Sequence, residues 1–78
     1  MKFRALTIPK DADGENLVDA IWGWQDDRWE FFISLVKGHG YFANFRRKGD
    51  AFTKPVSQTP YATMITATRG CERRHADF

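Results

Sequence analysis

The residues most able to do chemistry lie near the C-terminus, where Cys71 and His75 stand four positions apart. A thiol and an imidazole can form a nucleophile and base pair, but that chemistry also needs an orienting group and an oxyanion arrangement, and the sequence indicates neither. The same side chains offer two soft metal ligands, whereas a structural zinc site normally has four, and Cys71 is the single cysteine. We therefore expect no metal, no cofactor and no catalysis.

Three acidic residues, Asp26, Asp27 and Glu30, have the oxygen ligands that a hard cation prefers. A turn between two elements explains the aspartates more simply, because aspartate side chains accept hydrogen bonds from the backbone of turns. The sequence also lacks a phosphate-binding glycine loop and a nucleophile elbow. Together these patterns predict that the protein is not an enzyme.

Aromatic and basic side chains suggest a different chemistry, the binding of single-stranded nucleic acid. Residues 37–44, KGHGYFAN, match the RNP1 pattern of RNA-recognition sheets at only half of its eight positions. The cations for such binding would be Arg46, Arg47, Lys48, Arg69, Arg73 and Arg74, provided that the C-terminal ones return across a sheet. We place this interpretation second, because the formal net charge is only +2 and charge runs usually serve solubility.

Residues 26–48 must position most of these side chains, and we interpret them as a β-hairpin. Residues 29–36 alternate along a run rich in aromatic and aliphatic side chains, and residues 41–47 alternate again. Between them, Gly38 and Gly40 can take the positive φ angles of a short loop. A loop of four residues would set Phe32 opposite Phe45 on the same face as Tyr41.

The rest of the chain predicts an α+β domain. Residues 2–8 alternate as a first strand, and Asp13 can cap a helix with apolar residues at positions 17, 20, 21 and 24. Residues 51–59 read as a loop or broken edge strand, and residues 61–68 read as a last strand. The expected order is β-α-β-β with this further strand, one helix packing on an antiparallel sheet over residues 1–70, and residues 71–78 a charged tail.

One alternative keeps residues 17–36 as a single long amphipathic helix, since its polar positions fall in one arc. Gly23 in mid-helix and the interruption at residues 25–27 argue against it.

Residues 29–35, WEFFISL, and residues 41–47, YFANFRR, resemble two segments of a small bacterial domain family of unknown function. In that family a strand reading roughly G-W-E-L-V-S-V and a strand reading Y-x-x-F-K-R flank a glycine loop. The resemblance covers about residues 2–48, and Arg28 stands where the family usually has glycine. It implies a β-α-β-β domain and favours the hairpin over the long helix. It implies no catalytic residue and no substrate.

Aromatic residues make up 15% of the chain, and one helix covers only one face of a sheet. We therefore expect the other face, with Phe32, Tyr41, Phe45 and Arg47, to bind a protein partner or a second copy of the chain. Domains of this size without catalytic groups are often adaptors or inhibitors, including those of phages and mobile elements. The lone cysteine, with no signal peptide or membrane-length apolar run, predicts a cytoplasmic protein without a membrane partner.

Overall fold

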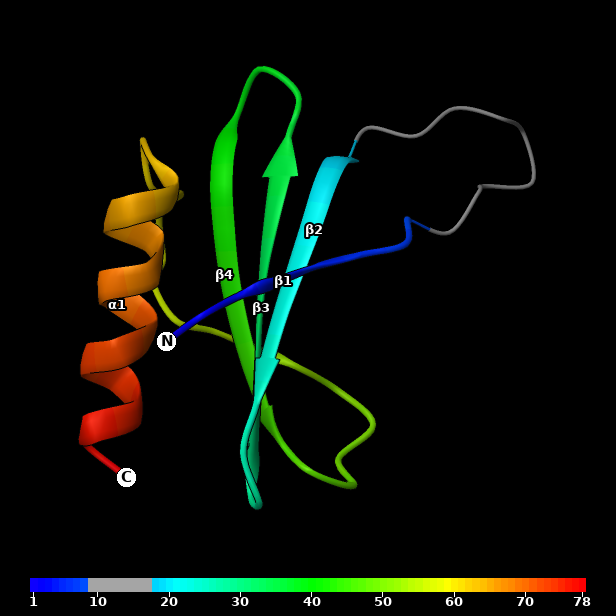
Figure 1. Cartoon of the computed structure of the whole chain (residues 1–78). Coiled ribbons are helices and arrows are strands. Elements are labelled where there is room, and N and C mark those ends of the chain that lie inside the picture. Colours follow the sequence, from blue (N-terminus) through cyan, green and yellow to red (C-terminus); the bar gives the residue numbers. More distant parts are fainter. Residues whose placement is uncertain (9–17) are drawn as a thin grey trace.

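The computed structural model describes residues 1–8 and 18–78, in which an antiparallel sheet packs against one helix (Figure 1). The elements are β1 Arg4–Leu6, β2 Val18–Gln25, β3 Trp29–Val36, β4 Gly40–Arg47, β5 Lys54–Pro55 and α1 Met64–Ala76. The strands lie in the order β1-β2-β3-β4-β5, so each pairs with its neighbour in sequence. The expected α+β class is confirmed for a single small domain, but the β-α-β-β order is wrong, because the helix follows all the strands.

The hairpin of β3 and β4 is confirmed, and the alternative of one long helix over residues 17–36 is wrong. Its loop is one residue shorter than expected, since Val36 pairs with Gly40 and the His39 N–H donates to the Val36 carbonyl at 3.0 Å. Gly38 and Gly40 have φ angles of 76° and 100°, as the tight turn requires. Gly40 also lies where a Cβ would be 2.8 Å from the Tyr61 carbonyl oxygen.

This shorter loop changes the register, and a shift of one residue moves every side chain of a strand to the other face. Phe45 pairs with Phe31, and Phe32 pairs with Asn44. The expected pairing of Phe32 with Phe45 is therefore wrong. The observed register places Phe31, Phe45 and the small Ala43 together under the helix, and it leaves the polar Asn44 on the opposite face.

The expected helix after Asp13 begins outside the described residues, and its described part lies in β2, Val18–Gln25, which is a strand instead. Its apolar residues fit a helical stripe, but Trp22 and Trp24 also alternate, and aromatic and β-branched side chains favour a pleated surface. Trp24 pairs with Phe31, and Trp22 pairs with Ile33, so both indole rings share the face that the helix covers. The sequence pattern of this segment fits a helix as well as a strand, and its pairing with β3 makes it a strand.

The segment expected to be a last strand, residues 61–68, instead contains the start of α1. Thr63 caps the helix, because its hydroxyl accepts from the Thr66 N–H at 3.1 Å and the Thr66 hydroxyl accepts from the Thr63 N–H. The expected charged tail of residues 71–78 is also wrong, since α1 continues to Ala76. No helix among the described residues has the length and apolarity needed to cross a membrane.

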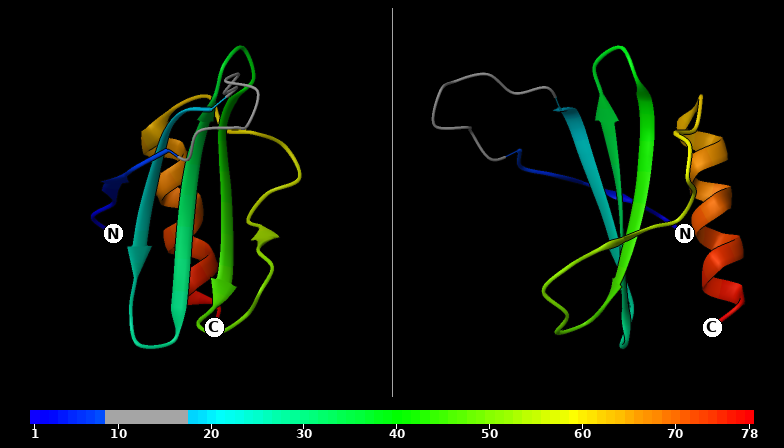
Figure 2. Two further views of the ribbon diagram at one scale, coloured as in Figure 1. Left: turned by 90° about the vertical axis from the view of Figure 1, so that its right-hand side faces the viewer. Right: turned by 180° about the vertical axis from the view of Figure 1, so that it is seen from behind.

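The core lies between α1 and the middle of the sheet, and Figure 2 shows the helix on one side of the strands. Phe31 and Ile33 of β3 are 0% exposed, as are Ala67 and Cys71 of α1. Small residues on the facing side of the helix let it approach the large sheet side chains closely. Tyr61 adds to this contact, since its backbone exchanges two hydrogen bonds with Tyr41 and its ring lies against Gly70.

Gly70→Ala should destabilise the protein although alanine favours helix. A methyl group at this buried position meets the Tyr61 hydroxyl and ring, and overpacking of this kind costs about 1–3 kcal/mol against a propensity gain of about 1 kcal/mol. Urea unfolding measures the change. The control places Gly70→Ala in a Tyr61→Ala background, where the substitution should be neutral or stabilising. A stabilised single variant would contradict the close contact.

Candidate protein-binding face

The side of the sheet opposite α1 carries large apolar side chains from four strands. Side chains alternate between the two faces along each strand, so the residues on the same face as Phe32 point away from the helix. They are Leu6 of β1, Ile21 of β2, Phe32 and Val36 of β3, and Phe42 of β4, and we call these five residues the open face. Leu6 is 43% exposed and Phe42 is 36% exposed, while the other three are partly buried.

A groove crosses the open face between β1 and β3. It is lined by Lys2, Arg4, Ala5, Leu6, Gly23, Trp24, Gln25, Glu30 and Phe32. The Leu6 side chain lies over Gly23, where a Cβ would be 2.8 Å from the Leu6 Cδ1. A glycine in β2 thus allows the leucine of the edge strand to lie down on the sheet beside the groove.

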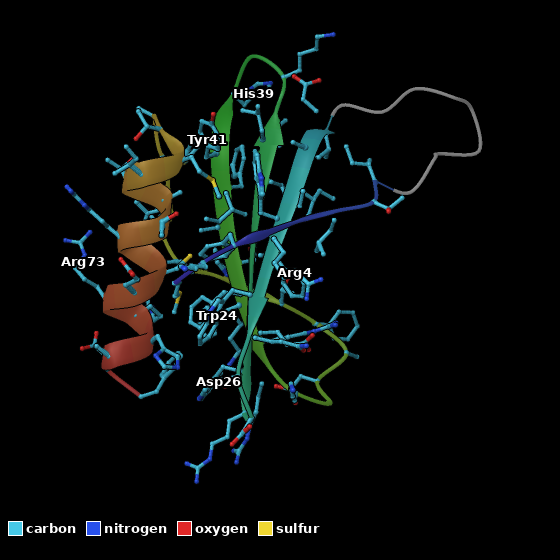
Figure 3. All side chains as sticks on the ribbon, viewed as in Figure 1. Arg4, Trp24, Asp26, His39, Tyr41 and Arg73 are labelled. Atoms are coloured by element: carbon cyan, nitrogen blue, oxygen red, sulfur yellow. The ribbon has the colours of Figure 1, made fainter. Side chains whose placement is uncertain are left out.

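Some of the charged side chains around this groove form an ion pair, and others do not. Glu30 accepts a hydrogen bond from the Arg46 Nε at 3.0 Å, and the Arg46 guanidinium also lies 5.4 Å from the centre of the Phe32 ring. Lys2 and Arg4 are exposed and form no ion pair with another described residue. Figure 3 shows Arg4 directed away from α1. The margin of the groove is therefore positively charged.

The residues expected to bind a partner do not share one surface. Phe32 lies on the open face, but Tyr41 and Phe45 face α1, where Phe45 is 5.8 Å from Phe31 between ring centres. Arg47 is exposed at the end of β4, paired with Trp29. The sequence prediction missed Leu6, Ile21 and Phe42. The alternation of side chains within each strand would have placed these three residues on the face of Phe32 only if the pairing between the strands had been predicted correctly.

The cations expected to bind nucleic acid are also separated. Arg46 lies on the open face, and Lys48 lies in the turn after β4. Arg74 of α1 packs on the opposite side of the sheet from the open face. Its guanidinium lies 5.6 Å from the Phe45 ring centre and donates a hydrogen bond of 3.0 Å to the Val56 carbonyl. Arg69 and Arg73 are exposed on α1, and Arg73 points away from the sheet in Figure 3. The six cations therefore form no single patch.

His75 and Asp26 form the contact closest to a catalytic pair, with 2.7 Å between Nε2 and Oδ2. Asp26 also accepts the Arg28 and Trp29 N–H groups at 2.8 and 2.7 Å, which is the turn structure that the sequence suggests for this acid. The hydrogen bond from the Arg28 backbone, then the one with His75 and the one from the Trp29 backbone, lower the pKa of Asp26 to about 2. Among the described residues, no hydroxyl or thiol hydrogen-bonds to His75. The pair fastens the end of α1 to the turn between β2 and β3.

Cys71 lies in the core among apolar residues. It is 0% exposed, and burial raises the pKa of its thiol to about 12, so the reactive thiolate is scarce at neutral pH. Among the described residues, no cluster of three or more histidine, cysteine or acidic side chains is arranged to hold a metal.

Comparison with known proteins adds no identification. No family model matches the sequence, and searches of curated proteins and of solved structures return no similar protein. The resemblance of residues 2–48 to a small bacterial domain family stays a prediction.

Phe45→Glu should destabilise the protein much more than Phe42→Glu, although both replace a phenylalanine of β4. Phe45 packs with Phe31, Trp29 and Phe78, so a carboxylate there should lower the free energy of unfolding by about 3 kcal/mol or more. Phe42 lies on the open face, so its replacement should cost less than about 1 kcal/mol. Urea unfolding measures both. Equal losses would contradict the assignment of faces.

Asp26→Asn should remove part of the acid sensitivity of folding. The folded-state pKa of Asp26 is depressed from 3.8 to about 2, so its ionised form contributes stability that is complete above pH 4 and lost as the pH falls through 2. Urea midpoints at pH 5 and pH 2.5 should therefore differ less for the variant than for the parent. The other carboxyl groups are common to both proteins. An unchanged difference would show that Asp26 is not coupled to folding.

Proposed function

We propose that this chain is a small non-enzymatic interaction protein that binds a protein partner through the open face, acting by occupancy as an adaptor or inhibitor does. One observation carries the proposal: five large apolar side chains from four strands gather on the side of the sheet that α1 does not cover. A group of apolar side chains at the surface, bordered by charged residues, is typical of interaction sites.

The energetics support a partner on this face. Burying a large apolar side chain contributes about 1.5–3 kcal/mol when it is taken from full exposure. Leu6 and Phe42 keep a considerable exposed fraction, and a small domain has little stability to spare. A partner that covers both would recover part of this free energy.

The edges of the sheet are less suited to binding than its face. β1 has three residues and β5 has two, one of them Pro55, which has no backbone N–H to donate. Short edge strands and proline discourage the addition of a strand from another chain. This favours side-chain contact over the face as the mode of binding.

A partner of a different kind is favoured over a second copy of the chain. Two copies meeting through this face would bring their exposed Lys2 and Arg4 side chains into the same interface, and like charges there oppose association. We expect the purified protein to sediment as a monomer.

One observation favours a second candidate, the binding of single-stranded nucleic acid. Phe32 and Phe42 are diagonal neighbours on adjacent strands, with the Arg46 guanidinium over the Phe32 ring, and bases stack on such aromatic side chains. Arg46 is already paired with Glu30, however, and Arg69, Arg73 and Arg74 belong to α1. We therefore rank this candidate below a protein partner.

Phe42→Glu should abolish partner capture while leaving the domain folded. The experiment captures proteins from nuclease-treated extract of the host cell on the tagged parent and on the variant, and identifies them by mass spectrometry. Phe52→Glu is the matched control, because Phe52 is 86% exposed but lies on the loop before β5. Proteins retained by the parent and the control, but not by Phe42→Glu, are the expected result.

The other outcomes separate the alternatives. Capture that disappears with nuclease, and weakens steeply with salt, would favour the nucleic-acid function. Dimerisation of the parent that Phe42→Glu abolishes would identify a second copy as the occupant. Equal capture by parent and variant would show that the open face is not the binding site.

A further inference from the structure

We infer that the groove between β1 and β3 recognises an acidic peptide segment of a partner protein, in which a large apolar side chain is flanked by carboxylates. This inference rests on the proposed function, because it specifies the partner that the open face binds. The apolar side chain contacts Leu6 and Phe32, and the carboxylates meet Lys2 and Arg4.

The apolar part of the site follows from the packing of Leu6. Its side chain lies against Gly23, so β2 presents no side chain of its own between the leucine and the ring of Phe32. Leu6 therefore covers the buried Gly23, and its side chain and the ring of Phe32 form the apolar lining of the groove. A single aliphatic or aromatic side chain from a partner can pack against Leu6 and Phe32.

The charge of the site follows from the pairing of Glu30. Arg46 pairs with this carboxylate at 3.0 Å, so the one acid among the described residues that line the groove is already engaged. Lys2 and Arg4 remain exposed, and no described acid lies within ion-pair distance of either. Asp19, the acid of β2, is not among the described residues that line the groove. An acidic segment is attracted to this margin, whereas a basic segment is repelled by it.

The test is a selection of random dodecapeptides displayed on phage against the immobilised full chain. The selected peptides are sequenced, synthesised and titrated by fluorescence anisotropy at 50 and 300 mM NaCl. We expect peptides enriched in aspartate and glutamate around an aromatic or aliphatic residue. Their affinity should fall at least tenfold in the double variant Lys2→Glu/Arg4→Glu and about threefold in Arg4→Gln.

The matched control is Arg69→Glu/Arg73→Glu, which changes the net charge equally but places the new acids on the exposed side of α1. It should alter the affinity less than twofold. If the control weakens binding as much as the groove variant, net charge alone is responsible and the inference fails. Circular dichroism verifies that each variant remains folded.

Failure of the inference is distinguishable from failure of the proposed function. Peptides that lose affinity in Phe42→Glu but contain no excess of acids, or that tolerate Lys2→Glu/Arg4→Glu, overturn the acidic partner and leave the binding face intact. A selection that returns no peptide dependent on Phe42 or on the groove overturns both.

Discussion

The fold depends on the burial of β3 against α1. Phe31 and Ile33 lose all solvent exposure because the helix presents Ala67 and Cys71 to them, residues small enough for the two layers to meet closely. Around this centre the larger aromatic rings form a partly exposed border, in which Phe78 stacks on Trp29 with 3.9 Å between ring centres. A chain of this length builds only a modest interior, so most of its stability must come from this one contact between helix and sheet.

That arrangement leaves the second face of the sheet to be stabilised in another way. Polar residues alternate with aromatic ones across the β3 and β4 pair, where Phe32 is opposite Asn44 and Ser34 is opposite Phe42. Arg46 further covers Phe32 with its guanidinium. The open face therefore keeps enough polarity for solvent contact while its apolar side chains stay available. This balance is the physical basis for treating it as a binding face.

Arginine has opposite roles on the two sides of the sheet. Arg74 comes from α1 and covers one edge of the core. Its guanidinium lies over the Phe45 ring and donates a hydrogen bond to the Val56 carbonyl. Arg46 comes from β4 and cancels the charge of Glu30, so that Lys2 and Arg4 set the sign of the groove margin. Neither role is visible from counting basic residues, since both depend on which layer each side chain joins.

The sequence by itself determined the β3 and β4 hairpin, because alternating aromatic and aliphatic residues around Gly38 and Gly40 have few other stable conformations in water. It also determined the turn at Asp26, a local preference of aspartate. Tertiary structure decided the rest. Residues 18–25 fit a helix or a strand equally well along the chain, and only pairing with β3 makes them a strand. Residues 64–76 contain β-branched side chains, but the capping by Thr63 and the burial of Ala67 and Cys71 make them a helix. The composition of the open face depended on a single residue of loop length, because side chains alternate across a sheet. The packing of Phe31 with Phe45 under α1 determines which side chains lie on the other side.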